Sequence, residues 1–414
     1  MIGLVAEGRT GSATVAGPGT GMGAKARSLA DRVGSTRVPD FLLGCSFIFG
    51  RYHTGLPIPV DVILTAGTIF VCAFVRPTVK VRGFGFYLLM WVTALAWVIA
   101  VSIHEGEPWL QRSFRCLLLV LFSVCLAQGR LLWRSFIAGY AFALIFINTP
   151  ANFTSLRGSG YEGFLLGFLG DKNVSGMVYA MIGIMTLAIL RTTTTRAIAF
   201  VVFSAALFAT GSRTSMMGFA AGCVWVFIRD RLGLTLRLVL AFLGWIGIRY
   251  VEEDLAEAGI FADRAGTDWF RGVIDVATVA KEHATPWYGR GLGTAWVAVA
   301  DDRRMWFHDS YAALRVEGGI PLLVAVVGLF VFVVWGLMDQ RTKVSDEQRV
   351  VEGAAIVILV CAWKLGEVFF AVPAFSVIGI ALCERYGSPI RAQEQLSLDT
   401  GQAMAVVPTT KDAQ

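Results

Sequence analysis

The chain has 414 residues, of which 56% are hydrophobic and only 16% are charged, and its mean hydropathy is +0.64. Soluble globular proteins contain about 45–50% apolar and about 25% charged residues, so this composition excludes a soluble globular domain. The formal charge of +6 comes from cations that are spread over many short segments. Because they form no basic stripe, nucleic acid is excluded as the expected partner.

Apolar runs alternate with short basic segments along most of the sequence. Runs of about 15–20 apolar residues are typical of membrane-spanning helices. The sequence therefore predicts an all-α, polytopic integral membrane protein with about 12 transmembrane helices. The predicted spans are 39–56, 60–75, 84–103, 113–128, 133–149, 173–190, 197–210, 214–228, 234–250, 318–337, 351–367 and 369–384.

These spans form one transmembrane domain over residues 38–385, between two polar tails. The tails, 1–37 and 386–414, have a composition that is typical of disorder. Lysine and arginine concentrate in alternate connecting segments, and the positive-inside rule places those segments and both termini in the cytoplasm. The longest connection, 252–308, is then extracytoplasmic.

Within this long loop, the sequence from Asp268 to Glu282 predicts an amphipathic helix. Its apolar residues recur at helical spacing and should share one side, which is expected to lie on the membrane or on the helix bundle. These residues are Trp269, Val273, Val276 and Val279.

Several kinds of site are not expected. The seven cysteines lie in apolar runs without a C-x-x-C pair, so neither a disulfide framework nor a zinc site is predicted. The glycine-rich strings 17–21 and 289–293 lack the strand and helix context of a nucleotide-binding loop. No cofactor or metal is predicted.

All four histidines, at positions 53, 104, 283 and 308, fall at or beyond the predicted outer face. Histidine is the usual general base near neutral pH. His308 is the strongest candidate, because it immediately precedes Asp309 and Tyr311 where the long loop meets a helix that carries Glu317. The alternative for any one of them is a hydrogen-bonded surface imidazole.

Cationic side chains on the predicted outer face form a second candidate group. Arg213 lies in a short break between two spans, at the rim of the bundle. Arginine is suited to binding a diphosphate with two hydrogen bonds, although Arg213 could instead reach lipid headgroups, and loop arginines could pair with loop acids. The other outer cations are Arg157, Lys172, Arg264, Arg271 and Arg290.

Four short strings follow one another in the second half of the chain. They are Gly-Asp-Lys-Asn at 170–173, Thr-Gly-Ser-Arg-Thr at 210–214, Pro-Trp-Tyr-Gly-Arg-Gly-Leu-Gly at 286–293 and His-Asp-Ser-Tyr at 308–311. In this order, and followed by Glu317-Gly-Gly-Ile, they resemble the O-antigen ligase and polysaccharide polymerase superfamily of bacterial membrane glycosyltransferases. The resemblance covers about residues 170–330 and the last helix pair.

The resemblance implies a GT-C-like enzyme of the bacterial inner membrane. Such an enzyme transfers a glycan from an undecaprenyl-diphosphate carrier to an acceptor hydroxyl on the extracytoplasmic face, without a metal, and segment 252–308 is then its catalytic loop. Arg213 matches the arginine that holds the diphosphate, and His308 matches the histidine that activates the acceptor. Either Arg264 or Arg271 corresponds to the family's loop arginine. The remaining matched or supporting positions are Asn173, Ser212, Asp309, Tyr311 and Glu317.

The sequence leaves other functions open. Lys364 and Glu367 lie three residues apart in a predicted span, so they could neutralise each other and serve a multi-span carrier. A peptidoglycan-type polymerase of the shape-and-division class is a further alternative, but its periplasmic aspartate motif is not found. Within the preferred family, the sequence does not separate a ligase from a polymerase.

Overall fold

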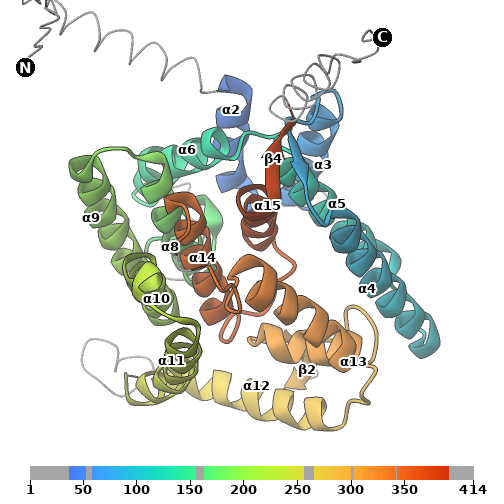
Figure 1. The fold of residues 1–414 in the computed structure, drawn as a ribbon. Helices are drawn as coiled ribbons and strands as arrows, with labels where there is room; N and C mark the ends of the chain where they lie inside the picture. The colour runs from blue at the N-terminus through green and yellow to red at the C-terminus, as the bar shows by residue number, and fades with distance from the viewer. Residues whose placement is uncertain are drawn as a thin grey trace, which may run out of the picture.

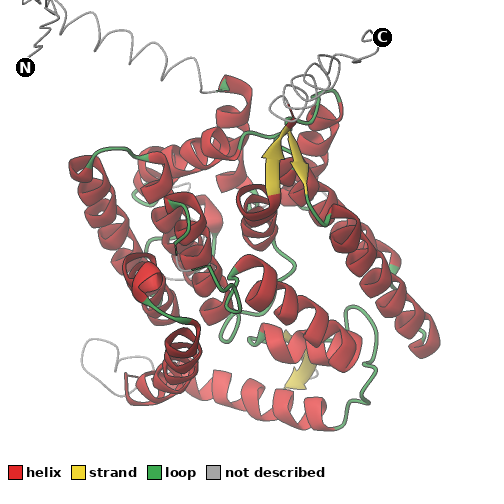
Figure 2. Ribbon diagram, in the orientation of Figure 1, coloured by secondary structure: helices red, strands yellow, loops and turns green. Residues whose placement is uncertain are grey.

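The computed structural model describes residues 37–52, 58–154, 163–255, 265–299, 303–341 and 343–390. This part of the chain is mostly helical, as Figure 1 and Figure 2 show. The predicted helical architecture is therefore confirmed. Strands in the described part are short: β1 (Val79–Val81) pairs with β4 (Gly387–Pro389), and β2 (Trp296–Val299) pairs with β3 (Arg303–Trp306), both antiparallel.

The helices follow the apolar runs of the sequence. The first half of the chain forms α2 (Val38–Ser46), η1 (Phe47–Phe49), α3 (Val60–Ala73), α4 (Phe84–Glu105), α5 (Leu110–Ala127), α6 (Trp133–Ala143), η2 (Leu144–Asn148), α7 (Thr149–Ala151) and η3 (Gly167–Leu169). The second half forms α8 (Lys172–Ile189), α9 (Thr193–Thr210), α10 (Arg213–Ile228), η4 (Arg229–Arg231), α11 (Leu234–Leu255), α12 (Ala265–His283), α13 (Ser310–Gly328), η6 (Leu329–Val334), α14 (Asp346–Cys361) and α15 (Val372–Tyr386).

Several of these helices have the length and composition of membrane spans. Among the described residues, five are long and apolar enough to cross a membrane: α4, α5, α8, α9 and α13 with its continuation η6. Shorter apolar helices cover Val38–Phe49, Val60–Ala73 and Leu234–Gly244. The core of the bundle lies where α14 packs between α8 and α10, and where α15 packs against α5.

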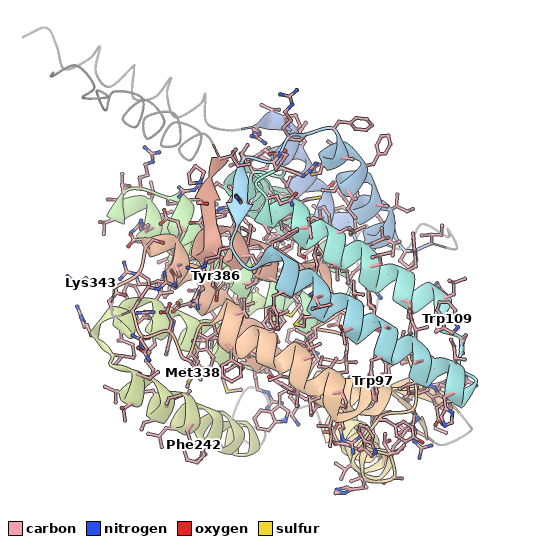
Figure 3. All side chains as sticks on the ribbon, turned by 45° about the vertical axis from the view of Figure 1, so that its right-hand side comes forward. Trp97, Trp109, Phe242, Met338, Lys343 and Tyr386 are labelled. Carbon is pink, nitrogen blue, oxygen red and sulfur yellow. The ribbon has the colours of Figure 1, made fainter. Side chains whose placement is uncertain are left out.

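The described residues of the predicted inner-face segments gather at one end of the bundle, which we call the basic end (residues 75–82, 130–134, 190–196, 229–237, 339–341, 343–349 and 385–390). Strand β1 pairs there with β4. Arg130 donates to the carbonyl of Val75, and Arg134 forms an ion pair with Glu347. Figure 3 shows Lys343 and Tyr386 on the opposite side of the molecule from Trp97 and Trp109.

The predicted loop helix forms as α12, but two of its predicted apolar residues do not face the bundle. In Figure 1, α12 lies along the lower edge of the molecule, below α13 and β2. Ile274 is fully buried against this layer, whereas Val276 is 72% exposed and Val279 is 52% exposed. The predicted apolar side therefore does not lie on the bundle at these two valines. The bundle-facing side instead carries Lys281, which donates to the carbonyls of Thr294 and Trp296.

The last two predicted spans are separated differently from the sequence pattern. Helix α14 ends at Cys361, and residues 362–371 form turns before α15 begins. These turns wrap around Ser310, whose hydroxyl contacts the carbonyls of Leu365 and Gly366. The prediction that Lys364 and Glu367 share a helix is therefore wrong, because tertiary hydrogen bonds hold their segment in a turn.

Candidate active site

His308 is positioned by the start of α13. Asp309 caps this helix, since its Oδ1 accepts hydrogen bonds from the backbone N–H groups of Tyr311 at 2.7 Å and Ala312 at 3.1 Å. Such a cap satisfies N–H groups that have no partner within the helix. Ser310 then bonds to the turns after α14. The result is a half-buried His308 that lies beside residues 364–367.

His308 lines a cavity of about 430 Å³ at the end of the bundle away from the basic end, and we call it the His308 cavity. Asp171 and Asn173 reach it from the start of α8, where the Asp171 carboxylate caps the helix. The charged side chains in its wall come from five different segments. They are Arg51, Asp61, Arg115, Asp171, Lys364 and Glu367.

A row of alternating charges begins in one wall of this cavity, with Asp61, Arg115 and Glu367, and continues beyond it. Arg115 contacts Asp61 at 3.0 Å and Glu367 at 3.3 Å. Arg112, one helical turn earlier on α5, contacts Glu367 at 3.5 Å and Glu317 at 3.1 Å. Each guanidinium therefore joins carboxylates from two different segments.

Arg112 and Arg115 were not among the site residues predicted from the sequence. The available signal was their spacing, because two arginines three residues apart at the start of an apolar span are costly unless they are used or paired. Their partners could not have been identified from spacing alone. Arg115 lies 54 residues from Asp61 and 252 from Glu367 in the sequence.

The glycine-rich string 286–293 has a packing role. Gly289, Gly291 and Gly293 all have positive φ values, between 84° and 100°. A Cβ atom on Gly291 would lie 2.8 Å from Cα of Ser102, so only glycine allows this approach to α4. The string also fixes Glu317, because the N–H of Gly293 donates to its Oε1 at 2.9 Å.

Of the predicted site residues, His308 and Asn173 meet in the His308 cavity. Arg213 is the half-buried first residue of α10, and this helix start adjoins the start of α8 through a contact of 3.5 Å from Ser215 Oγ to the carbonyl of Asn173. Ser212 is buried and bonds to Ser215. Arg213 therefore lies close to the cavity without being part of its described lining.

The other predicted residues lie elsewhere. The Lys172 ammonium is buried 5.0 Å from the ring centre of Phe164. The Arg290 guanidinium donates to the carbonyl of Ala284 and to Thr285 Oγ1. The Tyr311 hydroxyl donates to the carbonyl of Leu359. Arg157, Arg264 and His53 lie outside the described residues, as does the side chain of Arg271, and their predicted roles stay predictions.

The carboxyl of Asp309, at the start of α13, has a pKa that is raised toward neutrality. Burial raises the pKa of Asp309 from 3.8 to about 6, although the hydrogen bonds from Ala312 and Tyr311 oppose this rise. Glu282 raises the pKa further, and Lys364 lowers it. A carboxyl with a raised pKa therefore adjoins His308 in the sequence.

These groups could move a proton and bind an anion. An imidazole can accept a proton from a hydroxyl, and guanidinium and ammonium groups can stabilise an anionic leaving group. Among the described residues, no group of three His, Cys, Asp or Glu side chains could hold a metal ion.

Comparison with known proteins adds no assignment to this geometry. No protein-family model and no curated protein sequence matches the chain.

Proposed function

We propose that the protein is an outward-facing membrane glycosyltransferase of the O-antigen ligase or polymerase type. It transfers a glycan from a lipid-diphosphate-linked donor to an acceptor hydroxyl. The observation that carries this proposal is the His308 cavity, where one histidine meets Arg51, Arg115 and Lys364 at the end of a bundle of apolar helices. The order of sequence motifs, which includes His308 and Arg213, supports it independently.

The proposed reaction assigns a role to each group. His308 accepts the proton of the acceptor hydroxyl, and the oxygen forms a bond to the anomeric carbon of the donor. The bond from that carbon to the diphosphate breaks, and its electron pair leaves with the diphosphate. Fixed cations that already face the leaving group lower the barrier, because they need little rearrangement. Among the described residues, the cations that we propose for this role are Arg213, Arg51 and Lys364.

The proposal includes a membrane arrangement. We place the basic end in the bacterial cytoplasm with both termini, and the His308 cavity on the extracytoplasmic face, as the positive-inside rule favours. The chain then crosses the membrane with α2, α3, α4, α5, α6 with η2, α8, α9, α10, α11, α13 with η6, α14 and α15, which gives about 12 spans. The short helices among them would cross a thinner or locally adapted layer.

The structure offers no specific support for a carrier. Lys364 Nζ lies 3.6 Å from Asp275 of α12, while Glu367 contacts Arg112 and Arg115. The two residues therefore bind different partners, and they lie in turns between α14 and α15, away from the middle of a helix. We retain the transferase as the proposed function.

The test is glycan transfer by purified protein in detergent with EDTA, using a lipid-diphosphate-linked donor and several acceptors. His308→Ala should reduce the rate by about 10²–10⁴-fold, the usual contribution of a general base, and Arg213→Ala should also reduce it strongly. His104→Ala is the matched control, because His104 is exposed at the end of α4. It should leave the rate unchanged.

The acceptor that is used would separate a ligase from a polymerase. Equal loss in all three variants would indicate a folding defect. An absence of product from folded wild-type protein with every acceptor would contradict the proposed function.

A further inference from the structure

A second cavity of about 460 Å³ lies beside the His308 cavity, and we call it the Gln111 cavity. It is enclosed by the starts of α3 and α5, the first half of α13 and the turns before α15. Its polar lining includes Gln111, Arg112 and Glu317, and its aromatic lining includes Phe114 and Trp306. The proposed reaction chemistry does not use this space.

Two aromatic side chains that line the Gln111 cavity, Trp306 and Phe114, are exposed. Trp306 is 49% exposed and Phe114 is 55% exposed, and the Arg112 guanidinium lies 4.7 Å from the Trp306 ring centre. Broad aromatic faces bind the C–H faces of flat ligands, and nearby amide, guanidinium and carboxylate groups supply hydrogen bonds. This combination suits a ligand that is apolar on one face and rich in hydroxyl groups at its edge.

The charges of the Gln111 cavity balance. Arg112 and Arg115 are each paired with Glu367, and Arg112 is also paired with Glu317. A phosphate or other anion would compete with carboxylates that already occupy both guanidinium groups, whereas neutral hydroxyl groups can accept from the guanidinium and donate to the carboxylates. Glu367 remains 51% exposed and can receive such a hydroxyl. A neutral glycan is therefore the ligand that fits.

The two cavities share a wall. Arg115, Trp306, Phe307, Gly366 and Glu367 line both of them. A glycan that lies along Trp306 in the Gln111 cavity can therefore extend its last sugar past Glu367 toward His308. The base and the acceptor hydroxyl would then meet in the His308 cavity.

We propose that the Gln111 cavity binds the acceptor glycan of the transfer reaction. The assignment as an acceptor rests on the proposed function, but glycan binding to this cavity can be measured without any donor. Phe114, Gln111 and Trp306 are binding residues in this proposal, and the Arg115–Glu367 ion pair separates the acceptor chain from the donor site.

The first measurement uses the full chain and titrates acceptor at saturating donor, and then donor at saturating acceptor. Phe114→Ala removes an aromatic face that belongs to the Gln111 cavity and not to the described lining of the His308 cavity. The acceptor KM should rise about five- to tenfold, because this ratio corresponds to the free energy of one aromatic contact. The donor KM should stay unchanged. Leu117→Ala is the matched control, because Leu117 is 43% exposed one turn further along α5 and lines neither cavity in the described structure.

A second variant tests whether a folding defect could explain the effect of Phe114→Ala. Gln111→Trp keeps the core and fills the mouth of the cavity, because Gln111 is exposed at the start of α5. It should also raise the acceptor KM alone. A rise in the donor KM for both variants, or no change in either constant, would overturn the assignment.

The second measurement is calorimetric binding of neutral linear oligosaccharides of glucose, galactose or mannose, without donor. Wild type and Leu117→Ala should bind at least one of them, and Phe114→Ala and Gln111→Trp should bind it more weakly. Binding with this pattern but no transfer would contradict the proposed function and retain a glycan site. Absence of binding to wild type, or binding of glycerol phosphate alone with the same variant pattern, would overturn the glycan site.

Discussion

At the scale of single residues, Asp309 combines two roles that oppose each other. Its carboxylate caps α13, which favours the charged form, while burial disfavours that form more strongly. Burial therefore raises the pKa of this carboxyl to about 6 from the ordinary 3.8. The folded protein then takes up a proton between these two pH values that the unfolded chain does not take up, and this uptake favours the folded state at low pH.

Asp309→Asn should change how stability depends on pH. Asparagine also caps helices but does not titrate. The stabilising proton uptake is fully present below pH 3.8 and is lost as the pH rises through 6, since the folded pKa of Asp309 is raised to about 6. The variant should therefore be more stable than wild type above pH 7, by up to about 3 kcal/mol in the free energy of unfolding, with a higher melting temperature, and it should lose that advantage toward pH 4.

Thermal melts of both proteins in detergent between pH 4 and 8 measure this difference. Glu105→Gln, which replaces an exposed carboxylate at the end of α4, serves as the control for the substitution itself. A difference between Asp309→Asn and wild type that stays constant with pH would contradict the prediction.

At the scale of elements, α13 is two helices joined at Gly319. The backbone of Gly319 has φ 69° and ψ −166°, a conformation that is essentially restricted to glycine. A Cβ atom there would lie 2.1 Å from the carbonyl oxygen of Trp287. The same carbonyl accepts a hydrogen bond from Ile320, so the break joins the outer loop to the apolar part of α13.

Gly319→Ala should destabilise the protein by about 2–4 kcal/mol, because it combines backbone strain with a steric clash. Gly272→Ala is the control, since Gly272 lies in α12 and its added Cβ would meet no atom within 4 Å. Alanine in a helix should keep or raise stability there, by up to about 1 kcal/mol. Thermal melting and proteolysis of segment 284–299 would distinguish the two, and equal effects would contradict the role of the break.

Helix positions could be predicted because hydrophobic periodicity is local. The apolar runs located α4, α5, α8 and α9, and helical spacing located α12. The end of α14 at Cys361 could not be predicted, because the apolar pattern continues and the Ser310 hydroxyl that holds the following turn lies over 50 residues away. The sequence left two placements open for the apolar side of α12, on the membrane or on the bundle, for a similar reason, since β2 packs against the helix and helps to decide which side is covered.

Prediction of the site had the same limit. His308 was found because its position at a loop and helix junction is visible in the sequence. Arg112 and Arg115 were not found, because their partners come from α3, α13 and the turns before α15. Two cavities that share a wall are a property of the whole assembly, and no local pattern encodes them.

At the scale of the whole molecule, the basic end is held by charges that are buried. Glu352 is fully buried and accepts hydrogen bonds from Trp225, Arg229, Gln348 and Arg385. These residues connect α10, η4, α14 and α15. Removing one member of such a group leaves its partners as uncompensated buried charges.

Glu352→Ala should therefore destabilise the protein by about 3–5 kcal/mol. Glu347→Ala is the matched control on the same helix, because Glu347 pairs with an arginine whose side chain is 43% exposed and should cost at most about 1 kcal/mol. Thermal melting in detergent compares the two variants. A loss for Glu352→Ala as small as that for Glu347→Ala would show that the buried charges do not hold this end together.

The proposed orientation of the two ends requires Glu105 and Lys343 to lie on opposite sides of the membrane. Both residues are exposed, and α4 ends at Glu105 while Lys343 belongs to the basic end. The native cysteines are buried or half-buried, so their reaction with a polar maleimide should be slow. In intact cells, a membrane-impermeant maleimide should label Glu105→Cys, and it should label Lys343→Cys only after permeabilisation. Both variants should react after denaturation, which controls for expression.

Labelling of both from the outside would contradict the proposed arrangement, whereas labelling of Lys343→Cys alone would reverse it and move the His308 cavity to the cytoplasm.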